Sequence, residues 1–369
     1  MRLQEVLTKK DLSLFINFPF KLYKGDAFWV PPLRIDVKEI LSDSNPFWLH
    51  SSRKLFLALD DNGNVIGRIA AIIDQNYIDF QNTKVGFFGF FECVNDVQVA
   101  KALFDAAHGW IKENGIEKMM GPVNPSTNDT VGFLCENFDC SPAVMMPYSK
   151  EYYLSLAESA GLVKEKELYA YNMQVADGPA ERLSRAVKIT YKKNPGLKLR
   201  QLDKSNFARD LEDVMEIYNS AWEKNWGFVP WTAEEFKTIA QKLKMLADPG
   251  VIIIATLNEK PAGMLIALPD YNQVLKKING RLLPFGIFKF LYHKRKINAL
   301  RLMIMGVVKD YRMKGIEAAM YEMSLNYAMR AGYKTCEFSW ILEENIMTSR
   351  AAEMMGGVLY KKYRVYSSA

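Results

Sequence analysis

The chain has 369 residues, of which 49% are hydrophobic and 24% are charged, and it carries a net charge of +6. This balance is typical of a globular protein with two domains and excludes a chain too polar to form a core. No segment has the roughly 18 to 20 uninterrupted apolar residues of a membrane span, and the first residues lack the apolar run of a signal peptide. The four cysteines and three histidines follow no disulfide or metal-site spacing, so we expect no metal and a cytoplasmic location.

The first recognisable element is a β-hairpin over residues 55–74, in which two apolar runs flank an Asp-Asn-Gly-Asn turn. A second hairpin of the same form covers residues 251–270. Gly67 and Asp74 in the first align with Gly263 and Asp270 in the second, both at an offset of 196 residues. A constant offset of this kind indicates an internal duplication.

Further along the chain, matching residues recur at an offset of 217, and those near the end at 195. The matching pairs are Gly89 with Gly306, Gly115 with Gly332, Asn128 with Asn345, Gly161 with Gly356 and Tyr171 with Tyr366. The increase from 196 to 217 predicts an insertion of about 21 residues in the second copy, between Asp270 and Gly306. The compensating insertion in the first copy falls between Asn128 and Ala157.

We therefore predict an α/β (α+β) fold with two similar domains, each a mixed twisted sheet flanked by helices. The first domain covers residues 1–175, a charged linker helix covers 176–196, and the second domain covers 197–369. The elements expected in the second domain are strands at 197–203, 251–257, 262–268, 302–308, 334–341 and 358–366, and helices at 207–222, 316–331 and 347–355. The helix between Val308 and Thr335 should make its two flanking strands a parallel pair.

The insertion, near residues 271–300, lies in a basic stretch: residues 271–309 contain nine Lys and Arg and no acid. Its centre, residues 282–292, is apolar and flanked by basic residues, as in an interfacial element. We expect residues 276–301 to contact lipid or a membrane surface, or to cover a long acyl chain; a solvated basic surface is the alternative. The chain lacks a stripe of aromatic residues interleaved with basic ones, which argues against nucleic acid.

The stretch after the central strand, residues 307–318, has the composition of a phosphate-binding turn. An apolar strand is followed by a polar turn containing Arg312, Lys314 and Gly315, and then by a helix. Unpaired N–H groups and the helix dipole favour an anion at a helix N-terminus, and a glycine there allows close approach of the backbone. The alternative is an ordinary strand–turn–helix with a capping glycine.

At this turn the sequence resembles the GNAT superfamily of acyl-CoA-dependent N-acyltransferases. The family's hallmark is Arg/Gln-x-x-Gly-x-Gly/Ala after the central strand; residues 312–317 follow it, except that Glu317 replaces a small residue. Residues 88–93, 121–126 and 225–230 also resemble uncharacterised tandem GNAT proteins. The resemblance implies acetyl-CoA or a longer acyl-CoA as substrate, bound by Val307, Val308, Arg312, Met313, Lys314, Gly315, Ile316 and Asn345.

In the first copy, the residues that match Arg312, Gly315 and Glu317 are Asn95, Gln98 and Ala100. The arginine and the glycine are both missing. We expect this copy to have lost the cofactor and to serve as scaffold, as substrate wall or as the surface of a homodimer.

In a GNAT-type reaction an amine attacks the thioester directly, and the resemblance implies that the thioester oxygen meets the amide of Val307 or Val308. Glu343 and Asp270 are the candidate bases, because they lie at strand ends, where open α/β sheets form active sites. Ala352 stands where the family has a tyrosine, which leaves Tyr360, Tyr363 or water as the acid.

Asn225, Trp226 and Phe228 belong to an aromatic loop, residues 225–231, in a region that forms the acceptor wall of GNAT proteins. Core packing between the two copies is the alternative for this loop. We predict an N-acyltransferase with a small-molecule or peptide amine as acceptor. Two other functions stay open: a non-catalytic CoA- or lipid-binding protein, and an aminoacyl-tRNA-dependent transferase like the tandem GNAT-like enzymes that build peptidoglycan cross-bridges.

Overall fold

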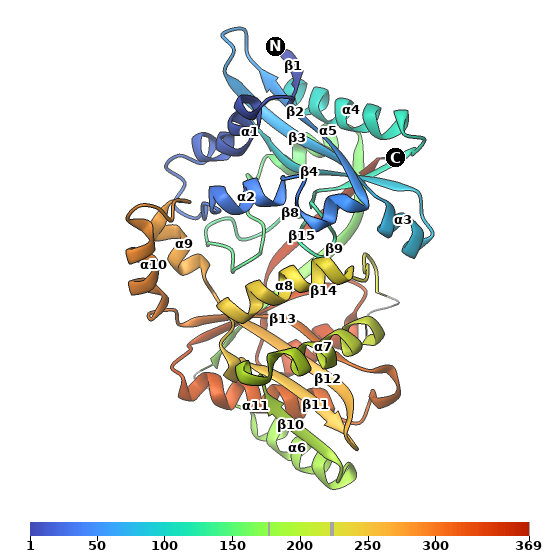
Figure 1. Cartoon of the computed structure of the whole chain (residues 1–369), viewed down its shortest axis with the longest axis vertical. Helices are drawn as coiled ribbons and strands as arrows, with labels where there is room; N and C mark the ends of the chain where they lie inside the picture. Colours follow the sequence, from blue (N-terminus) through green and yellow to red (C-terminus); the bar gives the residue numbers. More distant parts are fainter. Residues whose placement is uncertain (176–177, 222–224, 369) are drawn as a thin grey trace. The chain divides into compact units, whose positions relative to one another are not determined.

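The structure is a computed structural model that describes residues 1–175, 178–221 and 225–368. It divides into two compact units, and most of their elements are labelled in Figure 1. The first unit consists of Met1–Leu168, Asn272–Lys294 and Lys361–Ala369, and the second of Tyr169–Tyr271 and Arg295–Tyr360. Each unit therefore combines segments from both halves of the chain.

The sheet of the first unit contains six strands in spatial order. These are β1 (Arg2–Glu5), β2 (Ser51–Leu59), β3 (Val65–Asp74), β4 (Val85–Cys93), β5 (Lys118–Gly121) and the end of β15 (Val358–Ser368). β4 and β5 are parallel, and the other neighbours are antiparallel. Two short strands, β6 (Val123–Asn124) and β7 (Thr130–Val131), form a separate pair, and β8 (Phe133–Leu134) pairs with β15. Its N-terminal segment, residues 1–168, forms the helices α1 (Lys9–Leu22), α2 (Arg34–Ile40), α3 (Gln75–Gln81), α4 (Val97–Glu113) and α5 (Tyr153–Ser159).

Both faces of β3 are covered, because successive side chains of a strand point to opposite faces. Gly67 packs against α4, where a Cβ atom would lie 2.7 Å from Leu103 Cδ1. The next residue, Arg68, points the other way and donates a 2.8 Å hydrogen bond to the Phe15 carbonyl of α1. The strand is therefore held between α4 and α1.

The sheet of the second unit also has six strands in spatial order. They are the end of β9 (Leu162–Gln174), β14 (Thr335–Leu342), β13 (Ala299–Val307), β12 (Lys260–Pro269), β11 (Ile252–Leu257) and β10 (Leu197–Gln201). β13 runs parallel to β14, as the sequence predicts, and antiparallel to β12. The helices are α6 (Glu181–Lys193), α7 (Phe207–Ala221), α8 (Ala233–Leu246), α11 (Ile316–Arg330) and α12 (Ile346–Met354).

The two copies share a detail that the duplication predicts. The register of β2 and β3 shifts between Ala58 and Leu59, and that of β11 and β12 shifts between Ala255 and Thr256. The residue opposite the shift is Gly67 in one hairpin and Gly263 in the other. The predicted fold class is confirmed, and the predicted ends of the second-copy elements lie within about three residues of those observed. Trp222, at the predicted end of one helix, lies outside the described residues.

The boundaries of the units differ from the predicted domains at four places. Residues 169–175 belong to the second unit, and residues 361–368 belong to the first. The other two differences concern the insertion and the linker. The basic insertion forms α9 (Asn272–Ile278) and α10 (Gly286–Lys294) and packs with the first unit. The predicted linker, apart from residues 176 and 177 outside the described range, forms α6, which packs against α11 of the second unit. Sequence offsets reveal where an insertion lies in the chain, but not which core it joins.

Asp26, in the first unit, makes the stability of the chain depend on pH. It accepts hydrogen bonds from Lys150 Nζ at 2.8 Å and from the amides of Phe28 and Trp29. Burial alone would raise the pKa of Asp26, but Lys150 and the two amides hold it below its usual value. A lowered folded pKa stabilises the fold above the unfolded pKa, and this contribution is lost as the pH falls through the folded value.

We therefore expect Asp26→Asn to be less stable than the wild type at pH 7, with the difference shrinking below about pH 4. Urea unfolding at pH 7, 5 and 3 measures this. Asp139→Asn, at an exposed position, is the control and should follow the wild type at each pH. If Asp26→Asn were less stable than the wild type by the same amount at pH 7 and at pH 3, the charge of Asp26 would not be the cause of the pH dependence.

Candidate acyl-CoA site

Strands β13 and β14 separate along their length. They pair through four residue pairs, from Ala299 with Thr335 to Leu302 with Phe338. β13 then continues to Val307 alongside β12, and β14 continues to Leu342. One side of the second half of β13 is therefore without a strand neighbour in the described chain.

The amide of Val307 faces this gap. The amide of Val308 donates a 2.9 Å hydrogen bond to the Ala262 carbonyl of β12. Hydrogen-bonded and non-hydrogen-bonded pairs alternate in an antiparallel ladder, so the next pair, Val307 with Gly263, is non-hydrogen-bonded. The Val307 amide therefore points toward β14, whereas that of Val308 is already used. Of the two amides predicted to hold a thioester oxygen, the geometry favours Val307.

The turn after β13 leads into a helix whose first amides have no side-chain cap. Gly315 is the N-cap residue of α11, with φ +80°, and α11 has no side-chain cap bond. The amides of Ile316, Glu317 and Ala318 therefore have no partner within the helix, which is the property that lets a helix N-terminus bind phosphate. The side chains of Arg312, Met313 and Lys314 are exposed beside them.

Helix α6 contacts this turn through two side-chain hydrogen bonds. Asn194 Nδ2 donates to the Lys314 carbonyl at 3.1 Å, and Thr190 Oγ1 donates to the Gly315 carbonyl at 3.4 Å. A Cβ atom on Gly315 would lie 2.2 Å from Thr190 Oγ1, which is too close for any side chain without movement. The glycine is therefore required both by its positive φ and by the contact with α6.

The corresponding places in the first unit are filled by the chain itself. Phe90, the counterpart of Val307, donates its amide hydrogen to Asn124 Oδ1, and Asn124 Nδ2 donates to the Thr130 carbonyl at 3.1 Å. The N-terminus of α4 is capped by Asp96, which accepts from the amides of Gln98 and Val99. An internal side-chain amide and an internal carboxylate thus accept hydrogen bonds from the first-unit groups that correspond to the Val307 amide and to the N-terminus of α11.

A buried polar network lies where β13 and β14 separate, and the sequence analysis did not include it. Arg301 Nε donates to Ser339 Oγ at 3.0 Å, and Ser339 donates to Glu337 Oε1 at 2.6 Å. Arg301 and Glu337 are both 3% exposed and occupy paired positions on the two strands. Tyr360 donates to the other oxygen of Glu337. The sequence feature that could have revealed this network is a charged residue, Arg301 or Glu337, within each of two apolar strands.

The predicted acids and bases lie at different ends of the sheet. Glu343 and Asn345 follow β14, at the same end as the phosphate turn, because β13 and β14 are parallel. Asn345 Oδ1 caps α12 by accepting from the Thr348 amide, which leaves only its Nδ2 for a cofactor. Asp270 instead follows β12, which is antiparallel to β13, and its amide donates to Ala299, the first residue of β13. It is thus separated from the turn by about nine residues of strand, or roughly 30 Å.

Comparison with solved structures shows the fold. A tandem GNAT protein from the clavulanic acid biosynthesis pathway superimposes with a TM-score of 0.61 at 10% identity, covering 99% of this chain and 97% of that one. A GCN5-related N-acetyltransferase from Anabaena variabilis gives a TM-score of 0.50 at 10% identity, covering 99% of this chain and 72% of that one. The chain therefore has the tandem GNAT fold. No family model matches it.

Two curated relatives match nearly the whole chain. Protein YghO of Escherichia coli strain K12 is 35% identical over 370 residues, covering 98% of this chain and 93% of the relative. The bacterial ceramide synthase of Caulobacter vibrioides is 34% identical over 372 residues, covering 99% of this chain and 96% of the relative. This chain belongs to their family. Its fold is that of the tandem GNAT proteins.

In this family member, the predicted acceptor loop contributes to the core of the second unit. Phe228 is 6% exposed and packs on Tyr218, with ring centroids 5.2 Å apart. Tyr218 in turn stacks on Trp231 at 4.1 Å. Asn225 and Trp226, the other two predicted residues, are half-buried.

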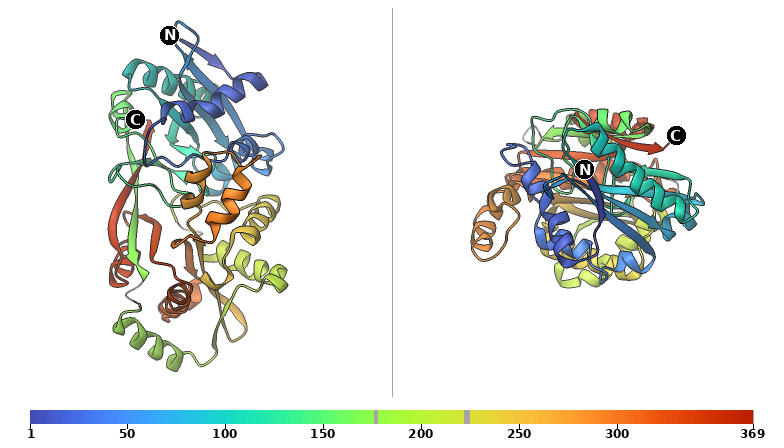
Figure 2. Two further views of the ribbon diagram at one scale, coloured as in Figure 1. Left: turned by 90° about the vertical axis from the view of Figure 1, so that its left-hand side faces the viewer. Right: turned by 90° about the horizontal axis from the view of Figure 1, so that it is seen from above.

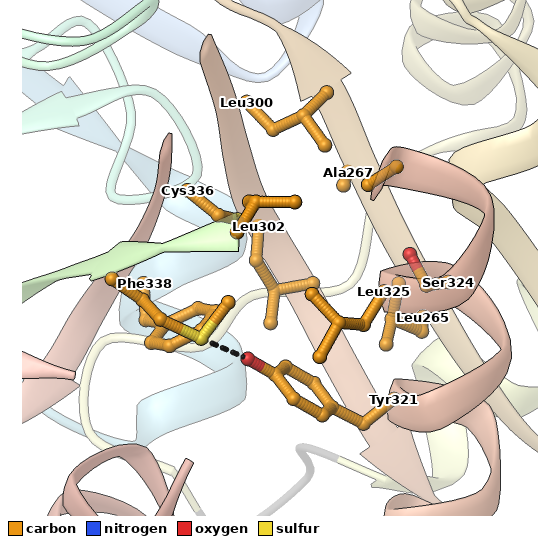
Figure 3. A pocket seen from close by; sticks show the side chains of 12 residues that line it. Leu265, Ala267, Leu300, Leu302, Tyr321, Ser324, Leu325, Cys336 and Phe338 are labelled. Carbon is orange, nitrogen blue, oxygen red and sulfur yellow. Dashed lines mark hydrogen bonds between the residues drawn. The ribbon is translucent and has the colours of Figure 1, made fainter. Parts of the chain in front are cut away.

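A cavity of about 20 Å³ lies between α11 and the sheet of the second unit (Figure 3). Its lining is almost wholly apolar and includes Leu302, Leu325 and Phe338. Tyr321, at one side, donates its hydroxyl to Met173 Sδ at 2.8 Å. A space of this size holds about one water molecule, so it is a packing void and not the site of a long acyl chain. Among the described residues, no helix combines the length and apolarity needed to cross a bilayer.

Proposed function

We propose that this chain is an acyl-CoA-dependent N-acyltransferase that acylates the amino group of a long-chain amino alcohol and so forms a ceramide-type amide. A ceramide is the amide of a fatty acid and such an amino alcohol. The proposal is supported by the 34% identity to the bacterial ceramide synthase over 99% of this chain. The observation that carries it is the contrast between the units: the strand gap and the helix N-terminus are open in the second and filled in the first.

The residues of the second unit supply binding and positioning. The first amides of α11, with Arg312 and Lys314, hold the pyrophosphate of CoA, since amides and cations at a helix N-terminus favour an anion. The Val307 amide donates a hydrogen bond to the thioester oxygen and so stabilises the negative charge that develops there. The amine nitrogen then attacks the thioester carbon, the carbon–nitrogen bond forms, and the carbon–sulfur bond breaks to release CoA thiolate.

Two protons have to move in this reaction. Glu343, at the same end of the sheet as the turn, is the proposed base that takes the proton from the amine. Tyr360 is a poor acid for the thiolate, because the tyrosinate left behind would be repelled by the carboxylate of Glu337. Tyr363 belongs to the first unit and is fully buried. Water is therefore the proposed acid.

The compartment that we propose is the cytoplasm. The four cysteines are all free thiols, which is typical of a reducing compartment. Burial raises the pKa of Cys93, Cys135 and Cys336 to about 12 in each case, so these three are unreactive thiols at neutral pH.

The test is to incubate the purified chain with palmitoyl-CoA and sphinganine in detergent, and to measure thiol release and the amide product by mass spectrometry. We expect N-acylation of sphinganine and little acylation of ethanolamine, which has the same head group without the chain. Glu343→Gln should lower kcat by about 10²- to 10⁴-fold. The adjacent, exposed Glu344→Gln is the matched control and should retain activity.

Other outcomes would redirect the proposal. Binding of CoA without turnover of any amine would identify a non-catalytic acyl-CoA-binding protein. Turnover that survives in Glu343→Gln would retain the transferase and remove Glu343 as its base. Absence of thioester binding would overturn the proposal.

A further inference from the structure

The insertion places a cluster of large apolar side chains in solvent. Leu283 and Phe285 are 75% and 74% exposed just before α10, and Phe288, Leu291 and Tyr292 are 69%, 56% and 60% exposed on the helix. The three helical residues have i, i+3 and i+4 spacing, so they share one stripe of α10. No residue of α10 is buried. We call these five residues the insert patch.

The segment before α10 is firmly attached to the first unit. Asn272 is buried, and its Nδ2 donates to the carbonyls of Pro142 and Ala143 at 2.9 and 2.8 Å. Arg34, at the start of α2, donates from its amide to the Gly280 carbonyl at 3.2 Å and from Nη1 to the Asn279 carbonyl at 3.1 Å. Both Figure 1 and the left view of Figure 2 show α9 and α10 side by side within this unit. An anchored segment thus carries an exposed apolar helix.

The anchor also brings a further apolar residue to the same region. Ile35, the neighbour of Arg34 in the chain, is 66% exposed. A cluster of large exposed apolar side chains of this kind on a globular unit is typical of an interaction site rather than of ordinary solvated surface.

The segment that contains the insert patch carries only positive charges. Residues 271–294 contain five Lys and Arg and no acid. Lys277, Arg281, Lys289 and Lys294 are exposed, and two of them lie on α10 itself. An apolar stripe flanked by cations complements the interface of a bilayer with anionic head groups, where the apolar side chains enter the acyl region and the cations meet phosphate.

We propose that the insert patch docks this chain onto an anionic membrane surface. The chain then lies on the bilayer without crossing it. Docking involves the first unit and uses no residue of the acyl-CoA site. The docking proposal can therefore be tested independently of the proposed reaction. If the reaction is as proposed, docking would place the enzyme where an amphiphilic acceptor and its product reside.

The experiment is vesicle co-sedimentation of the full chain, with neither CoA nor amine present. We expect binding to vesicles of phosphatidylglycerol and phosphatidylcholine in equal parts, and at least tenfold weaker binding to pure phosphatidylcholine. Binding should weaken from 0.1 M to about 0.5 M salt, because surface attraction between charges is screened. The variant Phe285→Ser, Phe288→Ser, Leu291→Ser should lose at least tenfold in affinity for the anionic vesicles.

A matched control replaces exposed apolar residues elsewhere. Leu7→Ser, Met245→Ser changes side chains that are 78% and 67% exposed and should leave vesicle binding unchanged. Circular dichroism of both variants should match the wild type, since none of the replaced side chains is buried.

Three results would overturn the docking proposal. One is a wild type that fails to bind anionic vesicles, and another is an insert-patch variant that binds them as tightly as the control. The third is a chain whose mass in solution is that of a dimer in the wild type and of a monomer in the insert-patch variant, which would assign the patch to a second copy. Activity in detergent should be the same in all three proteins, so a failure of docking is distinguishable from a failure of the reaction.

Discussion

Gly315→Ala is expected to lower the affinity of the chain for CoA by about 10- to 100-fold. Gly315 has φ +80°, where an alanine costs roughly 1–2 kcal/mol, and the new Cβ would lie 2.2 Å from Thr190 Oγ1. The turn has to move, and the amides that follow it move too. Losing one hydrogen bond to a charged group costs about 1.5–3 kcal/mol, which corresponds to this range of affinity. Calorimetric titration with CoA measures it, since the pyrophosphate is the same for every acyl chain.

The same helix supplies the control for this prediction. Gly332, just after α11, has φ +86°, and a Cβ there would meet open space. Gly332→Ala should therefore carry a similar conformational cost, of about 1–2 kcal/mol in stability, without any change in CoA affinity. Equal losses of affinity in the two variants would mean that Gly315 acts through the stability of α11 and not through a phosphate site.

Arg301→Met is expected to have the largest effect on stability, about 3–5 kcal/mol. Arg301 and Glu337 are buried partners at the point where β13 and β14 separate. Removing the guanidinium leaves the carboxylate of Glu337 buried with hydrogen bonds from Ser339 and Tyr360 but without its counter-charge. Breaking a buried ion pair by deleting one partner typically costs this much. Urea unfolding of the full chain measures the change.

Two further variants test whether the charge itself is responsible. Arg301→Met, Glu337→Leu removes both charges and should recover most of the lost stability, because a buried pair can be replaced by apolar side chains with little net cost. Arg209→Met, at an exposed position of α7, should stay within about 0.5 kcal/mol of the wild type. A double variant as unstable as the single one would show that shape, not charge, dominates at this position.

The part of the site that depends on local chain order was predictable from the sequence. The strand end, turn and helix start over residues 307–316 are determined by local sequence and not by distant contacts. The position of Gly315 at the N-terminus of α11 was therefore predictable from the neighbouring residues. α8 was also readable, because Thr232 and Glu235 form a capping box at its start. The predicted element order nevertheless omitted this helix.

The part that depends on strand direction was not predictable in the same way. Asp270 and Glu343 each follow an apolar strand and look alike in sequence, but β12 and β14 run in opposite directions. Their carboxylates therefore lie at opposite ends of the sheet. The choice of the Val307 amide rather than the Val308 amide depends on which β12–β13 residue pairs are hydrogen-bonded. No local sequence pattern reveals this.

The way in which the two units divide the chain has a genetic consequence. The first unit needs residues 272–294 and 361–368 from the second copy, and the second unit needs part of β9 from the first copy. Neither half of the gene, expressed alone, would encode a complete hydrophobic core. After the duplication, this exchange of segments would have removed the option of losing one copy by recombination. Each copy therefore contributes segments to both units, which gives a physical reason for the chain to retain the two copies together.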